Sequence, residues 1–348
     1  MLIQRFRDVS NASARRNKCA LFGPFGLHSL VSNSLPTVTV VIPTRPGQAE
    51  ILALVAARGL DYPREQLEII VARGRQPAVQ RNAALKMAQG ELIYFLDDDS
   101  RPAPGNLRRA VPHFTEPEVQ MVGGPNLCPP EAPPLEQVFA VALSSWLAFG
   151  PSRARYEAVG QLRPSTEKEL ILCNLIARRK ALQQLGGFDE SLYPNEENAL
   201  MDQLVKAGAT LLYDPEMIVY RRPRPTLKAF CKMLLSYGRG RAEQFRLHPT
   251  FGSTLNFVPP LFCLYLVLLP LFGLKGLAPL GFYASALVGQ TLASTFQKGF
   301  YHSVSALPLL VLTHLLYGLG FWRGLFTSLV RPAEPPAGSV ELEKIDLR

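Results

Sequence analysis

A long stretch without a single Asp or Glu constrains the fold of this chain most strongly. It runs from Leu255 to Val330, and its Lys and Arg residues are Lys275, Lys298 and Arg323. Three apolar segments divide it, each of about 20 residues, which as a helix of about 30 Å is long enough to cross the hydrocarbon core of a bilayer. We therefore expect membrane embedding through three transmembrane helices, over residues 255–274, 277–296 and 304–322.

The segment before this block is strongly basic. Residues 221–248 hold eight Lys or Arg against one acid, Glu243, within a chain of net charge +9. Residues 226–250 have the composition of a helix with an apolar face that lies in a membrane interface. Placed next to apolar spans, this charge favours lipid headgroups and phosphorylated substrates as partners, and not nucleic acid. It also places the N-terminal domain in the cytoplasm.

Both ends of the chain are predicted to lack regular structure. Residues 1–36 form a basic leader, expected to be flexible, and the proline-containing tail 331–348 is expected to be disordered. After an odd number of spans this tail would lie on the opposite side of the membrane from the N-terminal domain. The five Cys residues are scattered, which indicates neither a zinc site nor a disulfide framework.

Between these ends, strands and helices alternate at short spacing. The sequence predicts strands at 37–42, 67–71 and 93–96, with helices at 49–58 and 76–89 between them. This order is typical of an α/β domain with a parallel sheet, joined by right-handed crossovers. The pattern is Rossmann-like but has no G-x-G-x-x-G loop, so phosphates would be held by a metal and by side chains.

Three consecutive carboxylates, Asp97, Asp98 and Asp99, follow the third of these strands. Because like charges repel, such a run at a strand end favours a bound cation, and oxygen ligands suit Mg²⁺ or Mn²⁺. Open α/β sheets bind ligands at this carboxyl edge. The run therefore predicts a metal–diphosphate site, although a solvated acidic turn would have the same sequence.

Several motifs in a fixed order resemble those of the family 2 inverting glycosyltransferases, which have a GT-A-type fold. They are Pro43-Thr44 after the first strand, Arg81-Asn82-x-Ala84, Phe95-Leu96-Asp97-Asp98-Asp99, Gly186-Gly187-Phe188-Asp189-Glu190 and Asn195-Glu196-Glu197-Asn198. The resemblance covers roughly residues 37–250, with the domain itself at 37–225. The segment from Tyr220 to Arg241 resembles the bacterial exopolysaccharide branch that includes succinoglycan-type transferases.

The resemblance implies a role for each group of residues. Glu197 would be the catalytic base, with Glu196 as the other candidate, and Asp99 and Asp97 would bind the metal. The acceptor would lie near Gly187, Phe188 and Asp189. The nucleotide-sugar donor would be held by Pro43, Thr44, Arg45, Arg81, Asp97, Asp98, Arg239 and Arg241.

The sequence departs from the family pattern in two places. The second strand ends in Val71-Ala72-Arg73-Gly74-Arg75, where the family has an acid that helps to hold the nucleobase. The family's Gln-x-x-Arg-Trp motif is also missing, so Arg239 and Arg241 are its expected substitutes. Other interpretations remain open: these arginines could face lipid headgroups, and acids in a first helical turn are stabilised by the helix dipole whatever their function.

These observations predict a membrane-anchored inverting glycosyltransferase with its catalytic domain on the cytoplasmic side of the inner membrane. A carboxylate would accept the proton of the attacking hydroxyl. The acceptor would be lipid-linked or a growing glycan, and other envelope-polysaccharide enzymes are candidate partners. Two alternatives stay open: a polyprenyl-phosphate glycosyltransferase, and a catalytically inactive membrane scaffold of the same fold.

Overall fold

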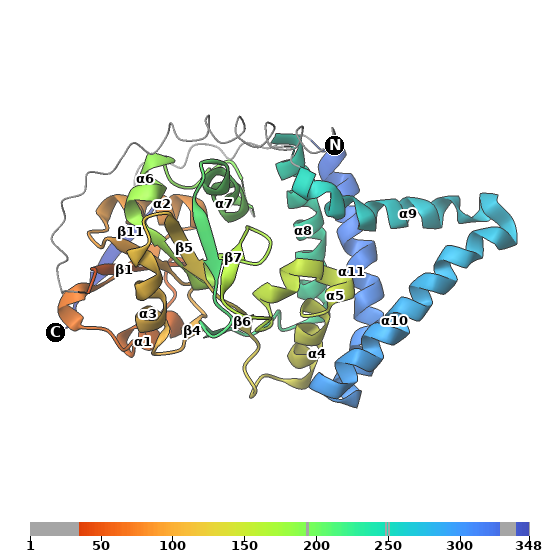
Figure 1. Ribbon diagram of the computed structural model, residues 1–348, viewed down its shortest axis with the longest axis horizontal. Helices are drawn as coiled ribbons and strands as arrows, with labels where there is room; N and C mark the ends of the chain where they lie inside the picture. Colours follow the sequence, from red (N-terminus) through yellow and green to blue (C-terminus); the bar gives the residue numbers. More distant parts are fainter. Residues whose placement is uncertain (1–34, 193–194, 248, 250, 328–338, 348) are drawn as a thin grey trace, which may run out of the picture.

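The computed structural model describes residues 35–192, 195–247, 249, 251–327 and 339–347. A sheet with helices on both faces occupies one side of the molecule, and long apolar helices occupy the other (Figure 1). The leader predicted over residues 1–36 lies outside the described residues, apart from 35 and 36.

The main sheet has the strand order β11-β2-β1-β3-β8-β5-β9-β7 within the described residues. Its strands are β1 (Val38–Thr44), β2 (Leu67–Arg73), β3 (Leu92–Phe95), β5 (Val119–Gly123), β7 (Arg163–Ser165), β8 (Leu175–Arg178), β9 (Thr210–Tyr213) and β11 (Glu341–Ile345). A small second sheet joins β4 (Arg101–Pro102), β10 (Val219–Tyr220) and β6 (Asn126–Leu127).

Helices cover both faces of the main sheet and bury two separate hydrophobic clusters. One face packs on α1 (Leu52–Arg58) and α3 (Asn106–Ala110). The other packs on α2 (Pro77–Met87), α6 (Arg179–Gln184) and α7 (Glu196–Lys206). The four residues of β3 are buried, as a strand covered on both faces requires.

The predicted parallel pairing is correct for the first three strands, and β5 and β9 also pair in parallel, but the sheet as a whole is mixed. Strand β1 pairs in parallel with β2 and β3, but β8 runs antiparallel to both of its neighbours, β3 and β5. The reason is topological. The chain leaves the sheet at the carboxyl end of β5 and returns to that same edge before β8, where Leu175 pairs with Gly123 and Phe95. A strand that starts at the carboxyl edge must run back.

The tail predicted to be disordered contributes a strand to the sheet. Residues 328–338 lie outside the described part, but β11 pairs antiparallel with β2 from Glu341↔Arg73 to Ile345↔Ile69. Its partly buried apolar residues Leu342 and Ile345 pack against the two hydrophobic clusters. The charged residues that suggested disorder lie between them and form ion pairs with β2: Lys344 with Glu68 at 2.6 Å and Glu343 with Arg73 at 3.2 Å.

The apolar side of the molecule contains α4 (Pro134–Leu143), α5 (Trp146–Phe149), α8 (Leu227–Leu247), α9 (Val258–Leu268), α10 (Leu277–Lys298) and α11 (Phe300–Phe326). The apolar face of α8 packs along α11 and on α4, where the rings of Phe230 and Phe139 stack at 4.4 Å. The backbones of α8 and α11 come so close that a Cβ on Gly238 would lie 2.0 Å from the carbonyl oxygen of Tyr317.

The three expected spans are not three long helices. The first, 255–274, includes the 11 residues of α9 as its α-helix, with 3₁₀ segments before it, Phe251–Phe257, and after it, Leu269–Gly276. Pro270 lacks the N–H that a continuing helix needs, and Gly273 has a φ of 57°, so the chain turns there. By length and composition, two helical stretches are apolar enough to cross a membrane: Thr254–Lys298, which includes this turn, and Phe300–Phe326.

We expect Leu342→Asp to lower the free energy of unfolding by about 2 kcal/mol, because it removes a partly buried apolar side chain and places a charge against the sheet. Chemical denaturation followed by circular dichroism measures this change. The control is Glu341→Ser, whose side chain is exposed in the same strand and should leave stability within about 0.5 kcal/mol of the parent. Equal stability of the two variants would show that β11 does not hold the sheet edge.

Candidate active site

A tight turn presents the three aspartates at the carboxyl edge of the sheet. The Leu96 N–H donates to the Val41 carbonyl at 3.1 Å, and the Ser100 N–H donates to the Asp97 carbonyl at 3.0 Å. This turn brings Asp98 beside the end of β1, where the Thr44 hydroxyl donates to Asp98 Oδ2 at 3.4 Å. The predicted donor residues Thr44 and Asp98 therefore lie together.

A chain of ion pairs links these aspartates to the start of α7. Arg81 of α2 donates from Nη2 to Asp97 Oδ1 and from Nη1 to Glu196 Oε1, both at 3.0 Å. Arg221, which follows β10, contacts Asp97 Oδ2 through Nη1 at 2.9 Å and Asp99 Oδ1 through Nε at 2.5 Å. Two guanidinium groups thus connect three carboxyl groups, two in the turn after β3 and one at the start of α7.

Burial and charge shift the pKa values of these groups in different directions. Burial alone would raise the pKa of Asp97, but the adjacent Arg221 and Arg81 outweigh it and hold that pKa below its usual value. Burial raises the pKa of Asp98, and the charges of Asp99 and Asp97 raise it further. Burial and the neighbouring Glu197 raise the pKa of Glu196, against the opposing effect of Arg81.

The same ion pairs bear on the predicted metal site. Both oxygens of Asp97 and one oxygen of Asp99 already contact guanidinium groups. Among the described residues, no group of three or more His, Cys, Asp or Glu side chains is arranged to hold a metal ion. The residues as they stand do not fit Mg²⁺ or Mn²⁺, because the guanidinium of Arg221 bridges Asp97 and Asp99 where the ion would bind.

The two acids at the start of α7 have different surroundings. Glu196 is buried and held by Arg81. Glu197 is half-buried, and its carboxylate makes no hydrogen bond or ion pair with any other described residue. Two arginines approach the same end of α7: Arg155 donates from Nη2 to Asn198 Oδ1 at 2.5 Å, and Arg241 from Nη2 to that oxygen at 3.4 Å. Both guanidinium groups thus contact the residue next to Glu197, and the charge of Glu197 acts on Arg241.

The structure separates the two arginines predicted in the basic helix. Arg241 reaches α7 as described, and burial together with the nearby charge of Arg155 lowers its pKa. Arg239 instead lies on the side of α8 that contacts α11, because a Cβ on Gly324 would lie 2.5 Å from the Arg239 carbonyl oxygen. Its Nε is 3.5 Å from Glu243, one helical turn away. Arg45, also predicted to bind the donor, is exposed just after β1, next to Pro43 and Thr44.

The predicted acceptor residues form a turn that is fastened to α2. The Asn82 side chain accepts from the Phe188 N–H and donates to the Phe188 carbonyl, both at 2.8 Å. Gly187 has a φ of 85°, and a Cβ there would lie 2.4 Å from Asn82 Oδ1, so this position requires glycine. The Phe188 ring is buried against Phe95, whereas Asp189 is exposed. The acceptor role of this turn stays a prediction.

The family model described as glycosyl transferase family group 2 matches residues 92–323, more than half of the 348 residues. The chain belongs to this glycosyltransferase family. Its fold is accordingly that of a GT-A-like α/β domain, here with a mixed sheet and followed by two long apolar helical stretches.

Curated relatives support this membership at a distance. The chain is 29% identical over 234 residues to the pre-mycofactocin glycosyltransferase of Mycobacterium tuberculosis, covering 61% of this chain and 48% of that protein. It is 30% identical over 196 residues to the succinoglycan biosynthesis protein ExoA of Rhizobium meliloti, covering 55% and 56%. The chain thus spans about half the length of the curated relatives it matches.

A solved structure has a similar fold. It is the mannosyltransferase PcManGT from Pyrobaculum calidifontis in complex with GDP-Man and Mn²⁺, with a TM-score of 0.52 and 17% sequence identity. The match covers 80% of this chain and 88% of the mannosyltransferase. At this identity the likeness establishes the fold alone.

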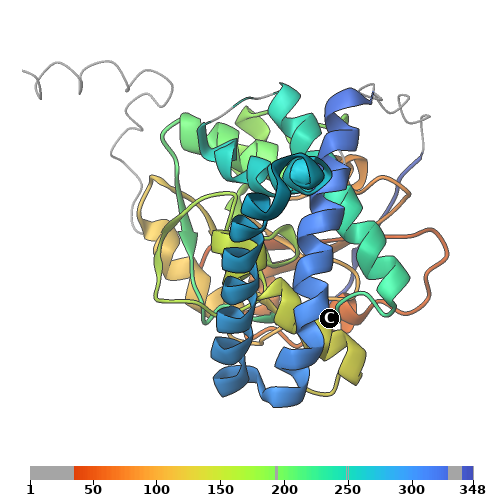
Figure 2. The ribbon, with the colours of Figure 1, turned by 90° about the vertical axis from the view of Figure 1, so that its right-hand side faces the viewer.

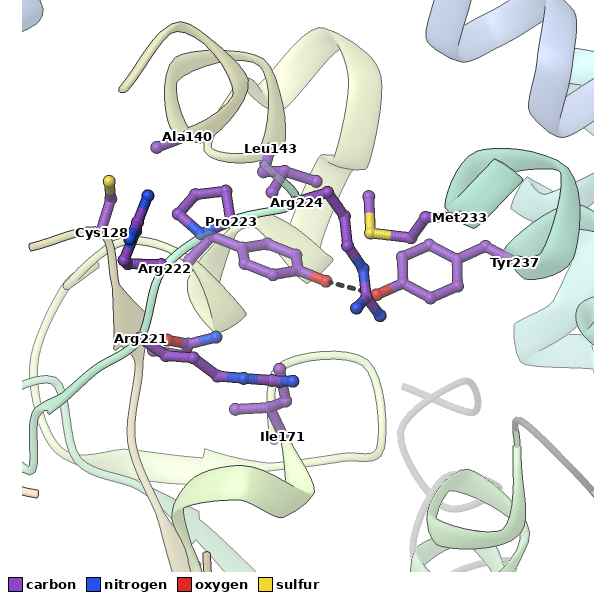
Figure 3. A pocket seen from close by; sticks show the side chains of 12 residues that line it. Cys128, Ala140, Leu143, Ile171, Arg221, Arg222, Pro223, Arg224, Met233 and Tyr237 are labelled. Atoms are coloured by element: carbon purple, nitrogen blue, oxygen red, sulfur yellow. Dashed lines mark hydrogen bonds between the residues drawn. The ribbon is translucent and has the colours of Figure 1, made fainter. Parts of the chain in front are cut away.

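A pocket lies between the glycosyltransferase domain and the apolar helices. Arg221, Arg222 and Arg224 line it together with apolar residues of α4 and α8, such as Leu143 and Met233 (Figure 3). Arg222 is paired with the buried Glu136, whereas Arg224 makes no ion pair with another described residue. The Tyr156 and Tyr237 hydroxyls, 3.3 Å apart, close one wall. The pocket is therefore cationic on one side and apolar on the other.

Sequence reasoning missed two arginines of this site. Arg221 lies in the basic segment 221–248, where the sequence predicts no role for it as a single residue. Arg155 lies in a polar stretch without a recognisable motif. Its guanidinium reaches Asn198 over 43 positions of sequence, a contact that no local pattern could reveal. The resemblance of the segment from Tyr220 to Arg241 to the exopolysaccharide branch is the one signal in the sequence that points toward Arg221.

We expect Arg81→Gln to destabilise the family's α/β domain by about 3–5 kcal/mol, because Asp97 and the buried Glu196 would both lose their cation. Arg81→Lys should recover only part of this loss, since an ammonium group cannot bridge two carboxylates as a guanidinium fork does. Thermal unfolding of the purified protein measures both effects. The control is Arg75→Gln. Arg75 is an exposed arginine two residues after the end of β2, so this variant should unfold like the parent. An Arg81→Gln variant as stable as the parent would show that these ion pairs do not stabilise the fold.

Proposed function

We propose that this protein is an inverting glycosyltransferase. It transfers a sugar from a nucleotide-diphosphate donor to a lipid-linked or polysaccharide acceptor at the cytoplasmic face of a membrane. One observation carries the proposal: Glu197 is unpaired among the described residues while its neighbour Glu196 is buried and held by Arg81. A carboxylate that is free, half-buried and adjacent to cationic side chains suits a general base.

The reaction follows from this arrangement in a single displacement. The acceptor oxygen attacks the anomeric carbon, and the bond from that carbon to the donor diphosphate breaks with its electron pair on the leaving oxygen. The acceptor proton passes to Glu197. Arg241 and Arg155 supply positive charge near α7. Burial and the neighbouring Arg155 lower the pKa of Arg241, so an anion such as the leaving diphosphate would stabilise its charged form.

The ion-pair chain supports a distinct role for Glu196. Because Arg81 contacts both Glu196 and Asp97, it fixes the start of α7 relative to the turn after β3. Glu196 is then a positioning residue, and the relative placement of base and donor depends on it. Mg²⁺ or Mn²⁺ remains the predicted cofactor from the resemblance. Arg221 would have to release Asp97 and Asp99 before these carboxylates could hold the ion.

The membrane arrangement is part of the proposal. Two helical stretches are long and apolar enough to cross a membrane. Residues 255–330 contain no Asp or Glu, unlike the surface helices of a soluble protein. Exposed Lys228 and Lys232 on α8 favour a surface of anionic lipid. Attachment at the cytoplasmic membrane would bring the site close to a lipid-linked acceptor.

A second candidate acceptor is a polyprenyl phosphate, for which the pocket between the domain and α8 is the supporting observation. Its arginines suit a phosphate group, and its lining from α4 and α8 is apolar, as the start of an isoprenoid chain would require. A phosphate acceptor already carries negative charge and needs no general base. The response to loss of Glu197 therefore distinguishes the two acceptor classes.

We expect Glu197→Gln to lower turnover by about 10²–10⁴-fold, the typical cost of losing a general base, with donor affinity and melting temperature near those of the parent. Glu196→Gln is the matched control and should depress turnover less. A screen of nucleotide sugars by thermal stabilisation identifies the donor, and its hydrolysis and transfer, with and without Mn²⁺, give the rates.

Three outcomes would change this assignment. A dead Glu196→Gln variant beside an active Glu197→Gln variant would exchange the two roles. Full activity of both would mean that the pair only starts a helix, or that the acceptor is a phosphate. If no nucleotide sugar stabilised the protein or were hydrolysed, the chain would be a scaffold of the same fold.

A further inference from the structure

One end of α11 is tied to the α/β domain and the other end to α8. At its start, Lys298 forms an ion pair with Glu157 at 2.9 Å, and a single residue, Gly299, separates Lys298 from α11. Glu157 belongs to the α/β domain, where its carbonyl accepts from the Tyr213 hydroxyl of β9 at 2.9 Å. At the other end, Arg246 of α8 donates to the carbonyls of Gly324 and Thr327, at 3.1 and 2.6 Å.

The middle of α11 also makes contacts with other elements, α5 and α8. His314 Nε2 lies 3.0 Å from the carbonyl of Leu147 in α5, ten residues before Glu157. A Cβ on Gly320 would lie 2.2 Å from the carbonyl of Leu235, so α8 and α11 pack backbone to backbone. A helix that crosses a hydrocarbon core of about 30 Å has its midpoint about 15 Å from either face. Because α11 makes these contacts at both ends and at its middle, we infer that it lies along the domain and does not cross the bilayer.

The tail gives an independent constraint on the same point. Strand β11 belongs to the main sheet, beside β2. Figure 1 shows β11 at the opposite end of the molecule from the turn between α9 and α10. Residue 339 must therefore be on the side of the membrane that holds the α/β domain.

One part of the apolar region does project away from the molecule. Helices α9 and α10 form a hairpin that leaves α11 and returns to it, and Figure 2 shows this hairpin pointing toward the viewer. Its turn exposes Leu271 and Leu274 at 79% and 86%. Only 11% of the most apolar stretch of Thr254–Lys298 is buried in the protein, against 44% for α11.

We propose that the α9–α10 hairpin enters the bilayer and returns to the face it came from, while α8 and α11 lie in the plane of that face. The partner of this surface is a lipid leaflet with anionic headgroups, since the hairpin carries no acid and α8 exposes Lys228 and Lys232. This inference rests on the membrane attachment proposed above. It goes further by placing residues 299 and 339 on the same side as the α/β domain.

Two positions distinguish this topology from its rivals. Three spans would place Gln297 on the domain side and Ser339 on the opposite side. One span over Thr254–Lys298 followed by a second in α11 would place Gln297 opposite and Ser339 on the domain side. The hairpin topology places both residues on the domain side. Both side chains are exposed and so are accessible to a reagent.

The test is labelling of the full chain in sealed membrane vesicles of both orientations with a membrane-impermeant maleimide. The variants are Gln297→Cys and Ser339→Cys, and the parent with its native cysteines is the blank. Val55→Cys, an exposed residue of α1, marks the side that holds the domain. A tag after Arg348, detected by antibody in the same vesicles, reports the side of the tail without altering β11.

We expect Gln297→Cys, Ser339→Cys and the tag to react only in the vesicle orientation in which Val55→Cys reacts. Reaction of either position in the other orientation overturns the hairpin topology and identifies which rival is correct. Flotation of the parent with phosphatidylglycerol-containing vesicles tests the attachment separately. Failure to float would overturn attachment and hairpin together, while the donor assays of the proposed transferase would stand on their own result.

Discussion

The guanidinium of Arg81 is the interaction on which the rest of the site depends. It extends from α2 and binds carboxylates from two other elements, Asp97 after β3 and Glu196 at the start of α7. Without it, buried negative charges would face one another at low effective dielectric constant, where repulsion is strong. The carboxyl edge of the sheet and the proposed base helix therefore hold their relative positions through one side chain.

Charge balance explains why two arginines are present. Asp97, Asp99 and Glu196 share Arg81 and Arg221, so one carboxyl group exceeds the cations when all are ionised. The raised pKa of Glu196 relieves this excess by favouring its protonated form. Its neighbour Glu197 stays outside the ion-pair chain, and this is the physical distinction between two adjacent and identical residues.

Close helix packing determines how the apolar half of the chain relates to the sheet. Glycines at 238 and 320 let α8 and α11 touch through their backbones, which long side chains would prevent. Since α8 is also tied to α7 through Arg241, α11 is drawn against the domain, whereas the turn between α9 and α10 projects away from it. An apolar helix of 27 residues can thus be a packing partner of a charged helix.

The sequence by itself determined the features that depend on local patterns. Alternating strands and helices, the acidic run after β3, the acid pair at the start of α7 and the acid-free block follow from residue spacing, because burial and helix geometry act over a few residues. Tertiary structure alone decided the direction of β8, the strand at 341–345, the partners of Arg155 and Arg221 and the course of α11. Each depends on long side chains or sheet edges meeting across tens to hundreds of positions, and composition carries no record of such contacts.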